Sequence, residues 1–164
     1  MVLFRCTQRV LKRFRIEPLD QPPRSSGLLG DWYVNLLNAG PARFVLCLNE
    51  RTLLPVILPA RKSEFPAAFP ATLQLILAAL GIAPEPIEAE VEAVQEVVFG
   101  RTESRVVLGA LNDFAFNARF YQATELRLTA TETALRLAEM PSKPIGYSSP
   151  DRAVQALFVG LGPS

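Results

Sequence analysis

Two strongly apolar runs on either side of a short polar segment limit the possible folds more than any other feature of this chain. Residues 43–48 and 53–58 are apolar on both faces, and the segment 49–52 between them reads Asn-Glu-Arg-Thr. Apolar runs separated by turn-forming residues predict two antiparallel strands joined as a hairpin. Because Pro55 has no backbone N–H to donate, we expect the second strand at a sheet edge or at a bulge.

The remaining segments extend this hairpin into an α+β arrangement. Residues 2–6 and 96–101 have the composition of strands, and residues 31–37 alternate between apolar and polar side chains, which predicts a half-buried strand. Helices are predicted over residues 7–15, 71–80, 105–121, 129–140 and 151–158, and a further helix is predicted to start after Pro84 and to carry Glu85, Glu88, Glu90 and Glu92. We therefore expect a single domain over residues 1–164, with a mixed, largely antiparallel sheet of about five strands packed by helices.

The helix predicted over residues 105–121 is the most informative one. Ser104 is a favourable N-cap for it. It carries one apolar stripe at helical spacing, formed by Val107, Leu111, Phe114, Ala118 and Tyr121. The opposite stripe, formed by Arg105, Gly109, Asn112 and Phe116, is not plainly polar. A glycine and a phenylalanine in that stripe suggest that the helix is central in the fold, with contacts on both sides.

Composition excludes several common kinds of site. The chain has two cysteines, Cys6 and Cys47, and no histidine. Both cysteines lie in apolar runs and are expected to be buried free thiols. A structural zinc site usually takes four Cys or His ligands, so this kind of site is nearly excluded, whereas a carboxylate site for magnesium or calcium stays open. We expect no metal site and no cofactor. Catalysis by a histidine of this chain is excluded, which removes the familiar nucleophile–histidine arrangements.

Charge and hydropathy say little about partners. The formal net charge is +1, which gives no general attraction to nucleic acid or to an anionic membrane. Charges interrupt the first fifteen residues too early for a signal peptide. The longest uncharged stretch, residues 65–83, is broken by Pro66 and Pro70 and is too short to span a bilayer. We therefore expect a cytoplasmic protein without a membrane partner.

The first candidate site is the polar face of the strand predicted over residues 31–37. Asp31, Tyr33 and Asn35 share this face and are candidate residues for a ligand groove. The alternative is a solvated strand face on which the tyrosine lies flat.

The second candidate site is the corner where a strand runs into the helix that begins at Ser104. Free N–H groups and the positive end of the helix dipole suit an anion there, and Arg105 adds a charged donor. Asn112 and Asp113 follow about two turns later and are expected near the same cavity. The alternative is simple capping by Ser104, with Arg105 paired to Glu103 or Asp113, or bonded to carbonyls of the loop at 18–30.

The third candidate site is the basic first helix. Arg9, Lys12 and Arg13 lie in a segment without acidic residues, and such a face can bind phosphate backbones. More often a face of this kind is only solvated, or it pairs with an acidic segment such as residues 85–96.

Several short strings together resemble an uncharacterised bacterial family, a domain of unknown function. They are Arg5-Cys6-Thr7-Gln8, Leu29-Gly30-Asp31-Trp32-Tyr33, Asn35-Leu36-Leu37, Asn49-Glu50-Arg51-Thr52-Leu53, Ser104-Arg105, Val107-Leu108-Gly109, Leu111-Asn112-Asp113-Phe114-Ala115-Phe116 and Ile145-Gly146-Tyr147. The resemblance covers roughly the whole chain. It implies a small, soluble, stand-alone protein, and it assigns no activity, cofactor or catalytic residue.

The sequence therefore assigns no activity. The interpretation that needs the fewest special assumptions is a non-catalytic binding or interaction domain whose partner is a protein or a small anion. One alternative is a small enzyme without histidine that uses Asp31, Glu50 or Asp113 as general base. Another is a nucleic-acid accessory protein that uses the basic first helix.

Overall fold

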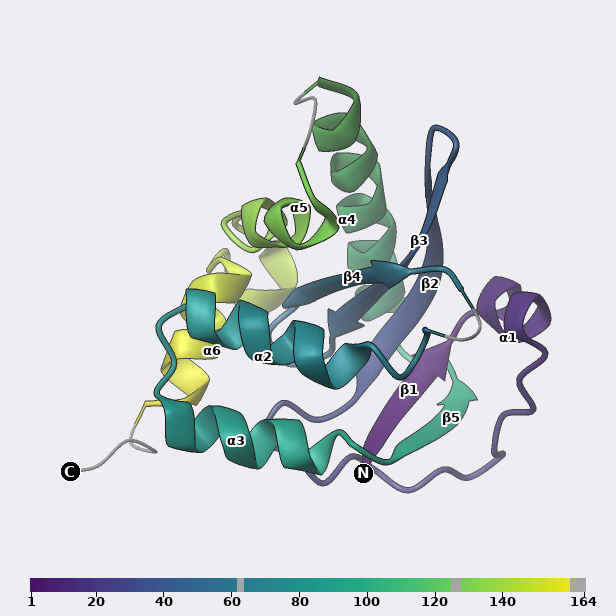
Figure 1. Cartoon of the computed structure of the whole chain (residues 1–164), viewed down its shortest axis with the longest axis horizontal. Helices are drawn as coiled ribbons and strands as arrows, with labels where there is room; N and C mark the ends of the chain where they lie inside the picture. The colour runs from purple at the N-terminus through teal and green to yellow at the C-terminus, as the bar shows by residue number, and fades with distance from the viewer. Residues whose placement is uncertain (62–63, 125–127, 160–164) are drawn as a thin grey trace.

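The computed structural model describes residues 1–61, 64–124 and 128–159 of the chain. Its elements follow the predicted order of strand, helix, three strands, two helices, strand and helices (Figure 1). The strands are β1 (Val2–Cys6), β2 (Trp32–Ala39), β3 (Ala42–Asn49), β4 (Pro55–Pro59) and β5 (Val97–Arg101). The helices are α1 (Gln8–Phe14), α2 (Phe69–Ala79), α3 (Pro84–Ala93), α4 (Arg105–Thr124), α5 (Ala130–Leu137) and α6 (Pro150–Leu157), with a 3-10 turn, η1 (Lys143–Ile145).

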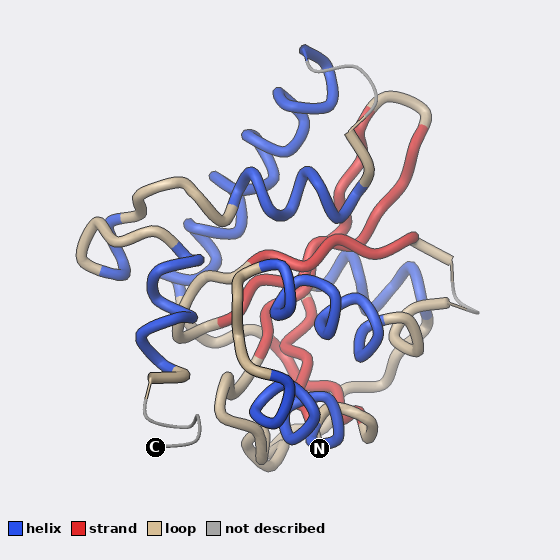
Figure 2. The backbone as a smooth tube through the Cα atoms, turned by 60° about the vertical axis from the view of Figure 1, so that its left-hand side comes forward, coloured by secondary structure: helices blue, strands red, loops and turns tan. Residues whose placement is uncertain are grey.

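The strands described form one mixed sheet in the order β4-β3-β2-β1-β5. β2–β3 and β3–β4 are antiparallel, whereas β1–β2 and β1–β5 are parallel. This arrangement confirms the predicted α+β class and its five-stranded mixed sheet. β4 lies at one edge, as Pro55 requires. Figure 2 shows the strands in the middle of the molecule with helices on either side.

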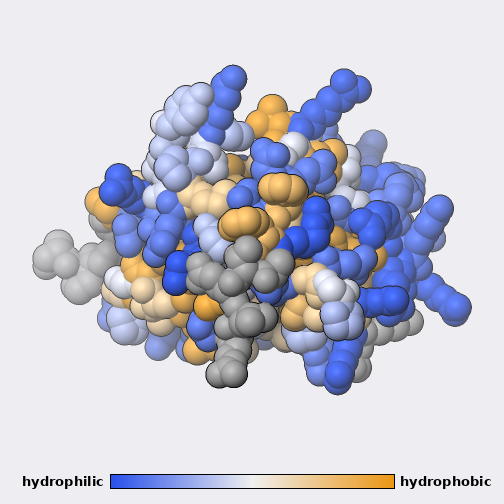
Figure 3. Space-filling view, turned by 90° about the horizontal axis from the view of Figure 1, so that it is seen from above, coloured by the Kyte–Doolittle hydropathy of each residue, from blue (hydrophilic) through white to orange (hydrophobic). Residues whose placement is uncertain are grey.

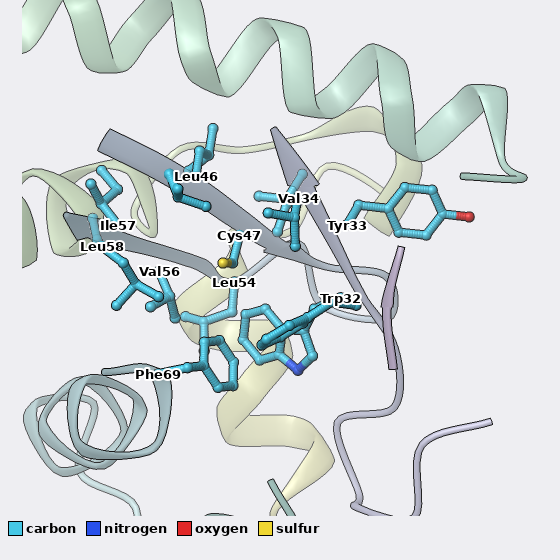
Figure 4. Packing of buried hydrophobic residues seen from close by; sticks show 14 of the residues in the cluster. Trp32, Tyr33, Val34, Leu46, Cys47, Leu54, Val56, Ile57, Leu58 and Phe69 are labelled. Atoms are coloured by element: carbon cyan, nitrogen blue, oxygen red, sulfur yellow. The ribbon is translucent and has the colours of Figure 1, made fainter. Parts of the chain in front are cut away.

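The pairing of the strands shows which buried side chains lie on each face of the sheet. Phe4 pairs with Trp32, so both side chains point to the same face, where Phe69 of α2 packs edge-on against each ring at 4.9 Å. Leu46 and Ile57 point to the other face, which α4 and α5 cover (Figure 4). Both faces are thus covered by helices, and large aromatic and aliphatic side chains fill the space on each side.

β2 confirms the strand predicted over residues 31–37, but the prediction that one of its faces is solvated is wrong. Tyr33 and Asp31, on the face expected to be polar and solvated, are each 1% exposed. The strand lies inside the sheet between β1 and β3, and α4 packs over that face. Alternation in the sequence reports polarity, and it cannot distinguish a solvated polar group from a buried one that has partners.

α4 is where the expected central helix lies, but the stripe opposite its buried one is exposed. Its inner stripe packs on β2 and β3, and Leu111, Phe114 and Ala118 are buried there. Phe116, in the opposite stripe, is 65% exposed, so the prediction of contact on both sides is not met within the described chain. The helix continues past the sheet, beside the projecting β2–β3 hairpin (Figures 1 and 2).

Cys6 and Cys47 are free and buried, as predicted. Both are paired with Val34, one from β1 and one from β3, so a whole strand lies between them. Two strand spacings amount to about 9–10 Å, beyond the reach of about 7 Å that a disulfide allows. Burial raises the pKa of the Cys6 thiol to about 12. Burial, and then the neighbouring Cys6, raise the pKa of Cys47 well above its usual value.

None of the helices described combines the length and the apolar character that crossing a bilayer would require.

Candidate functional site

The polar residue at the start of β2 lies beneath the preceding loop and not in a groove. Asp31 Oδ1 accepts a hydrogen bond from the Ser25 N–H at 3.0 Å, and Oδ2 accepts one from Arg5 Nε at 3.3 Å. Arg5 is itself only 4% exposed, and it also donates to the Arg101 carbonyl at 3.1 Å. A buried ion pair needs such additional hydrogen bonds to offset the desolvation of both charges. Asp31 is therefore committed to closing the fold.

The loop over residues 18–30 is held down along its length, although its Pro, Ser and Gly content predicts a mobile segment. The Leu28 and Leu29 N–H groups donate to the two oxygens of the buried Glu90 carboxylate, at 2.8 and 3.1 Å. A Cβ at Gly27 would lie 2.5 Å from Glu90 Oε1, so any larger residue would have to displace this carboxylate. The loop and α3 are thus joined through one internal carboxylate.

Glu50 lies beside this cluster and shares a cation with it. Arg24 Nη1 is 3.5 Å from Glu50 Oε1 and 3.9 Å from Asp31 Oδ2. Burial, and then the charge of Asp31, raise the pKa of the Glu50 carboxyl, while Arg24 opposes the shift. A raised carboxyl pKa is a property of many general acids and bases, and also of structural ion-pair networks. The structure therefore places two of the three candidate carboxylates together, and it places the third, Asp113, on α4.

Tyr33 and Asn35 also serve internal contacts. The Tyr33 hydroxyl accepts a hydrogen bond from the Ser104 N–H at 2.9 Å, which ties β2 to the beginning of α4 (Figure 4). Asn35 Oδ1 accepts from the Thr7 hydroxyl at 2.7 Å and from the Leu36 N–H at 2.8 Å. Because its hydroxyl is used in this way, Thr7 is the N-cap residue of α1 without a capping hydrogen bond from its side chain.

The N-terminus of α4 has the predicted cap but not the predicted ion pairs. Ser104 Oγ accepts from the Val107 N–H at 3.2 Å, which confirms the capping role. Glu103 lies 3.3 Å from Arg5 Nη1 instead of pairing with Arg105. In the part of the chain that the structure describes, the exposed Arg105 side chain has no hydrogen bond or ion pair. The loop at 18–30 is bonded by other groups, so Arg105 does not close it.

A surface groove of ≈ 470 Å³ runs between α4 and the segment that follows α5. Arg105, Gly109 and Asp113 contribute to the α4 wall, and Pro141 and Lys143 contribute to the other wall. The groove thus brings together Arg105 and Asp113 from the second candidate site. Asn112 is exposed on the same helix but is not part of this lining.

The outer side of α4, which carries Arg105, Gly109 and Phe116 and lines the groove, is open to solvent. Val106 is 62% exposed, and Phe116, which also lines the groove, projects from the same side. A Cβ built on Gly109 would have no neighbour within 4 Å. Seen from the end of α4 and the β2–β3 hairpin, apolar side chains emerge between hydrophilic ones (Figure 3). This side of the helix combines exposed apolar groups with charges that have no partner in the described chain.

The basic helix α1 presents three cations to solvent. Arg9, Lys12 and Arg13 are exposed, and the Arg13 guanidinium carbon lies 6.0 Å from the centre of the Phe14 ring. α1 is only seven residues long. Binding of nucleic acid at this helix stays a prediction.

Sequence reasoning missed three residues that organise the polar interior, and only Arg5 had a signal in the sequence. Arg5 is a lone charge within the apolar strand Val2–Cys6, and a charge in such a position needs a buried partner. Glu90 looks like one of several acids in α3 but is buried. Asn49 lies in the predicted turn, and its side-chain Nδ2 donates hydrogen bonds to the Leu29 and Asp31 carbonyls. Its Oδ1 accepts hydrogen bonds from the backbone N–H groups of Arg51 and Thr52. Glu90 and Asn49 were hidden because only the tertiary fold shows which of several polar residues turns inward.

Comparison with known protein families matches residues 3–153 to a family described as Domain of unknown function (DUF6933). The chain belongs to this family. The match confirms the resemblance to an uncharacterised domain family, and the matched residues of the DUF6933 domain include both the Asp31 cluster and the α4 groove. No curated protein and no solved structure matches the chain. Within the described residues, no group of three or more His, Cys, Asp and Glu side chains is arranged to hold a metal ion.

Proposed function

We propose that this protein is a non-catalytic interaction domain that binds a partner polypeptide along the outer side of α4. The observation that carries the proposal is the open stripe of this helix. Val106 and Phe116 are exposed at helical spacing on either side of Gly109, directly beside the groove. Exposed apolar side chains that border a groove with charged residues at its rim are typical of protein-binding surfaces.

The charges of the groove fit a polypeptide better than a simple anion. Arg105 and Lys143 would both attract an anion, but Asp113 lies in the same lining and would repel it. A polypeptide can satisfy both signs with its own side chains, and it can cover the exposed phenylalanine as well.

The carboxylate alternative has less support at Asp31 and Glu50. Asp31 is 1% exposed, and hydrogen bonds from Ser25 and Arg5 occupy its oxygens. A general base must reach a substrate proton, which Asp31 cannot do under the loop that covers it. Glu50 is the more accessible of the two, and its raised pKa has an internal cause in burial and in Asp31.

Site-specific photo-crosslinking tests the proposal. A benzophenone amino acid replaces Phe116, or in the control replaces Leu75, which is 63% exposed on α2. In extract of the source cells, we expect position 116 to form a defined polypeptide adduct and position 75 to form none. Excess unlabelled wild-type protein should compete for the adduct, and Phe116→Asp protein should not. Equal labelling at both positions, or labelling that no competitor reduces, would contradict the proposal.

A thermal-shift measurement separates the anion from the polypeptide. If inorganic phosphate raises the melting temperature of the wild type but not of Arg105→Ala, the groove is an anion site, because a bound ligand stabilises only the protein that binds it.

A further inference from the structure

We infer that the polypeptide bound along α4 is the α4 helix of a second copy of this chain, in an antiparallel dimer whose two-fold axis passes near Gly109. This inference rests on the proposed function and names its partner. An isologous dimer requires one patch that is complementary to itself. The outer side of α4 meets this requirement in the placement of its charges about a central glycine.

The charges on this side of α4 are arranged symmetrically about Gly109. Arg105 lies four residues before it and Asp113 lies four residues after it, and all three line the groove. At a rise of 1.5 Å per residue, the two charges are about 6 Å from the glycine in opposite directions along the helix. In an antiparallel pair centred on Gly109, Arg105 of each copy therefore lies opposite Asp113 of the other. The pair makes two such contacts, and neither charge has a partner within the described part of one chain.

Gly109 allows the two helices to come close together. A glycine inside a helix is destabilising by about 0.5–1 kcal/mol relative to alanine. Nothing within the described chain requires a glycine here, because a Cβ would meet no atom within 4 Å. At the crossing point of two helices, the absence of a side chain lets the backbones approach closely, within or below the usual interaxial distance of about 8–10 Å.

The apolar residues complete the patch. Phe116 lies seven residues after Gly109, so in the antiparallel pair it lies opposite residue 102, just before the other α4 begins, while Val106 lies opposite Asn112. Each phenylalanine, 65% exposed in the single chain, would thus be covered by the second copy at the edge of the interface. The groove of ≈ 470 Å³ beside α4 is too small for a whole helix, but it can take side chains of the second copy.

Charge-swap variants test this geometry. Arg105→Glu alone places two carboxylates in each contact, and Asp113→Arg alone places two guanidinium groups there. We expect each variant alone to dissociate about 100-fold more readily than the wild type, because like charges replace opposite charges in both contacts. Mixing the two variants should restore the dimer as a heterodimer, since one copy then carries two acids and the other two arginines. Sedimentation velocity over a concentration series measures all four samples.

Matched controls separate this interface from general effects of charge and of folding. Arg9→Glu makes the same charge change on α1 and should leave the dimer as stable as in the wild type. Phe116→Asp should prevent dimerisation, whereas Leu75→Asp on α2 should not. Far-ultraviolet circular dichroism checks that each variant is folded, which we expect because all of these side chains are exposed.

The outcomes distinguish the inference from the proposed function. Wild-type protein that stays monomeric at every concentration overturns the dimer, as does a mixture of the two swap variants that fails to associate. If a different polypeptide is then crosslinked at position 116, the interaction function stands with another partner. If position 116 forms no adduct, the interaction function fails as well.

Discussion

Arg5 and Arg105 occupy opposite kinds of site, although each lies beside carboxylates at one end of a regular element. Arg5 is 4% exposed and is held by Asp31, Glu103 and a backbone carbonyl. Arg105 is exposed on α4, and its side chain has no partner in the described chain. The first arginine makes its contacts within the fold, and the second leaves them to be made by another molecule. A charged residue near carboxylates is therefore informative about function only when its own chain does not already provide it with ion pairs or hydrogen bonds.

The largest expected loss of stability comes from removing Arg5, whose partners all lie within the fold. Arg5→Ala leaves Asp31 buried without its main counter-charge, and we expect a loss of about 3–5 kcal/mol in the free energy of unfolding. Arg105→Ala should change it by no more than about 0.5 kcal/mol, as is usual for an exposed surface residue. Urea denaturation of both variants, at concentrations where the protein is monomeric, measures the difference. Equal losses for the two variants would show that the contrast between the sites is wrong.

Glu90 extends the comparison to two acids on one helix. Glu90→Ala leaves the Leu28 and Leu29 N–H groups without their acceptor, and we expect a loss of about 2–3 kcal/mol, since each unmet buried donor costs about 1–3 kcal/mol. Glu88→Ala, on the exposed side of the same helix, should have little effect. Hydrogen exchange at Leu28 and Leu29 provides a second readout. Exchange that stays slow in Glu90→Ala would mean that other contacts hold the loop.

Replacing Gly109 should change stability by a smaller amount, and it should increase the free energy of unfolding. Gly109→Ala should stabilise the monomer by about 0.5–1 kcal/mol, because alanine favours the helix and a Cβ meets no atom of the described chain. Chemical denaturation at low protein concentration measures this gain. A destabilised variant would mean that the glycine has a role within the fold, and it would remove one support for a close helix–helix approach.

The sequence predicted the elements well because hydrophobic pattern and turn residues are local signals. The strands at 2–6, 43–48 and 53–58, the cap at Ser104 and the end of α2 before Gly81, which has a φ of 82°, all follow from such signals. The hairpin between β2 and β3 was not predicted, although Asn38, Gly40 and Pro41 are turn-forming residues between the two predicted strands.

The candidate sites were harder to predict because they depend on which face a neighbour covers. Asp31, Tyr33 and Asn35 have the polarity of a solvated face, and their partners come from segments as distant as Ser104. Asn112 and Asp113 are adjacent in sequence, yet only Asp113 lines the groove with Arg105. Helical periodicity identified the outer side of α4, but it could not show that this side is open.

The smallest expected change in stability comes from Glu50. This residue is half-buried and is only partly paired within the fold, so it is intermediate between Arg5 and Arg105. Burial and Asp31 raise its pKa in the folded protein above the ordinary value of 4.5, so the folded state binds this proton more tightly than the unfolded state does. The stability that this proton contributes is fully present below about pH 4.5 and is lost as the pH rises through the folded pKa. Glutamine has no charge to desolvate, so the free energy of unfolding of Glu50→Gln, relative to wild type, should increase between pH 4 and pH 7. Urea denaturation at the two pH values measures this, with Glu88→Gln as the control for losing one exposed carboxylate. A relative stability that instead falls toward pH 7 would show that Arg24 outweighs burial and Asp31, and that Glu50 belongs with the carboxylates whose charge the fold satisfies.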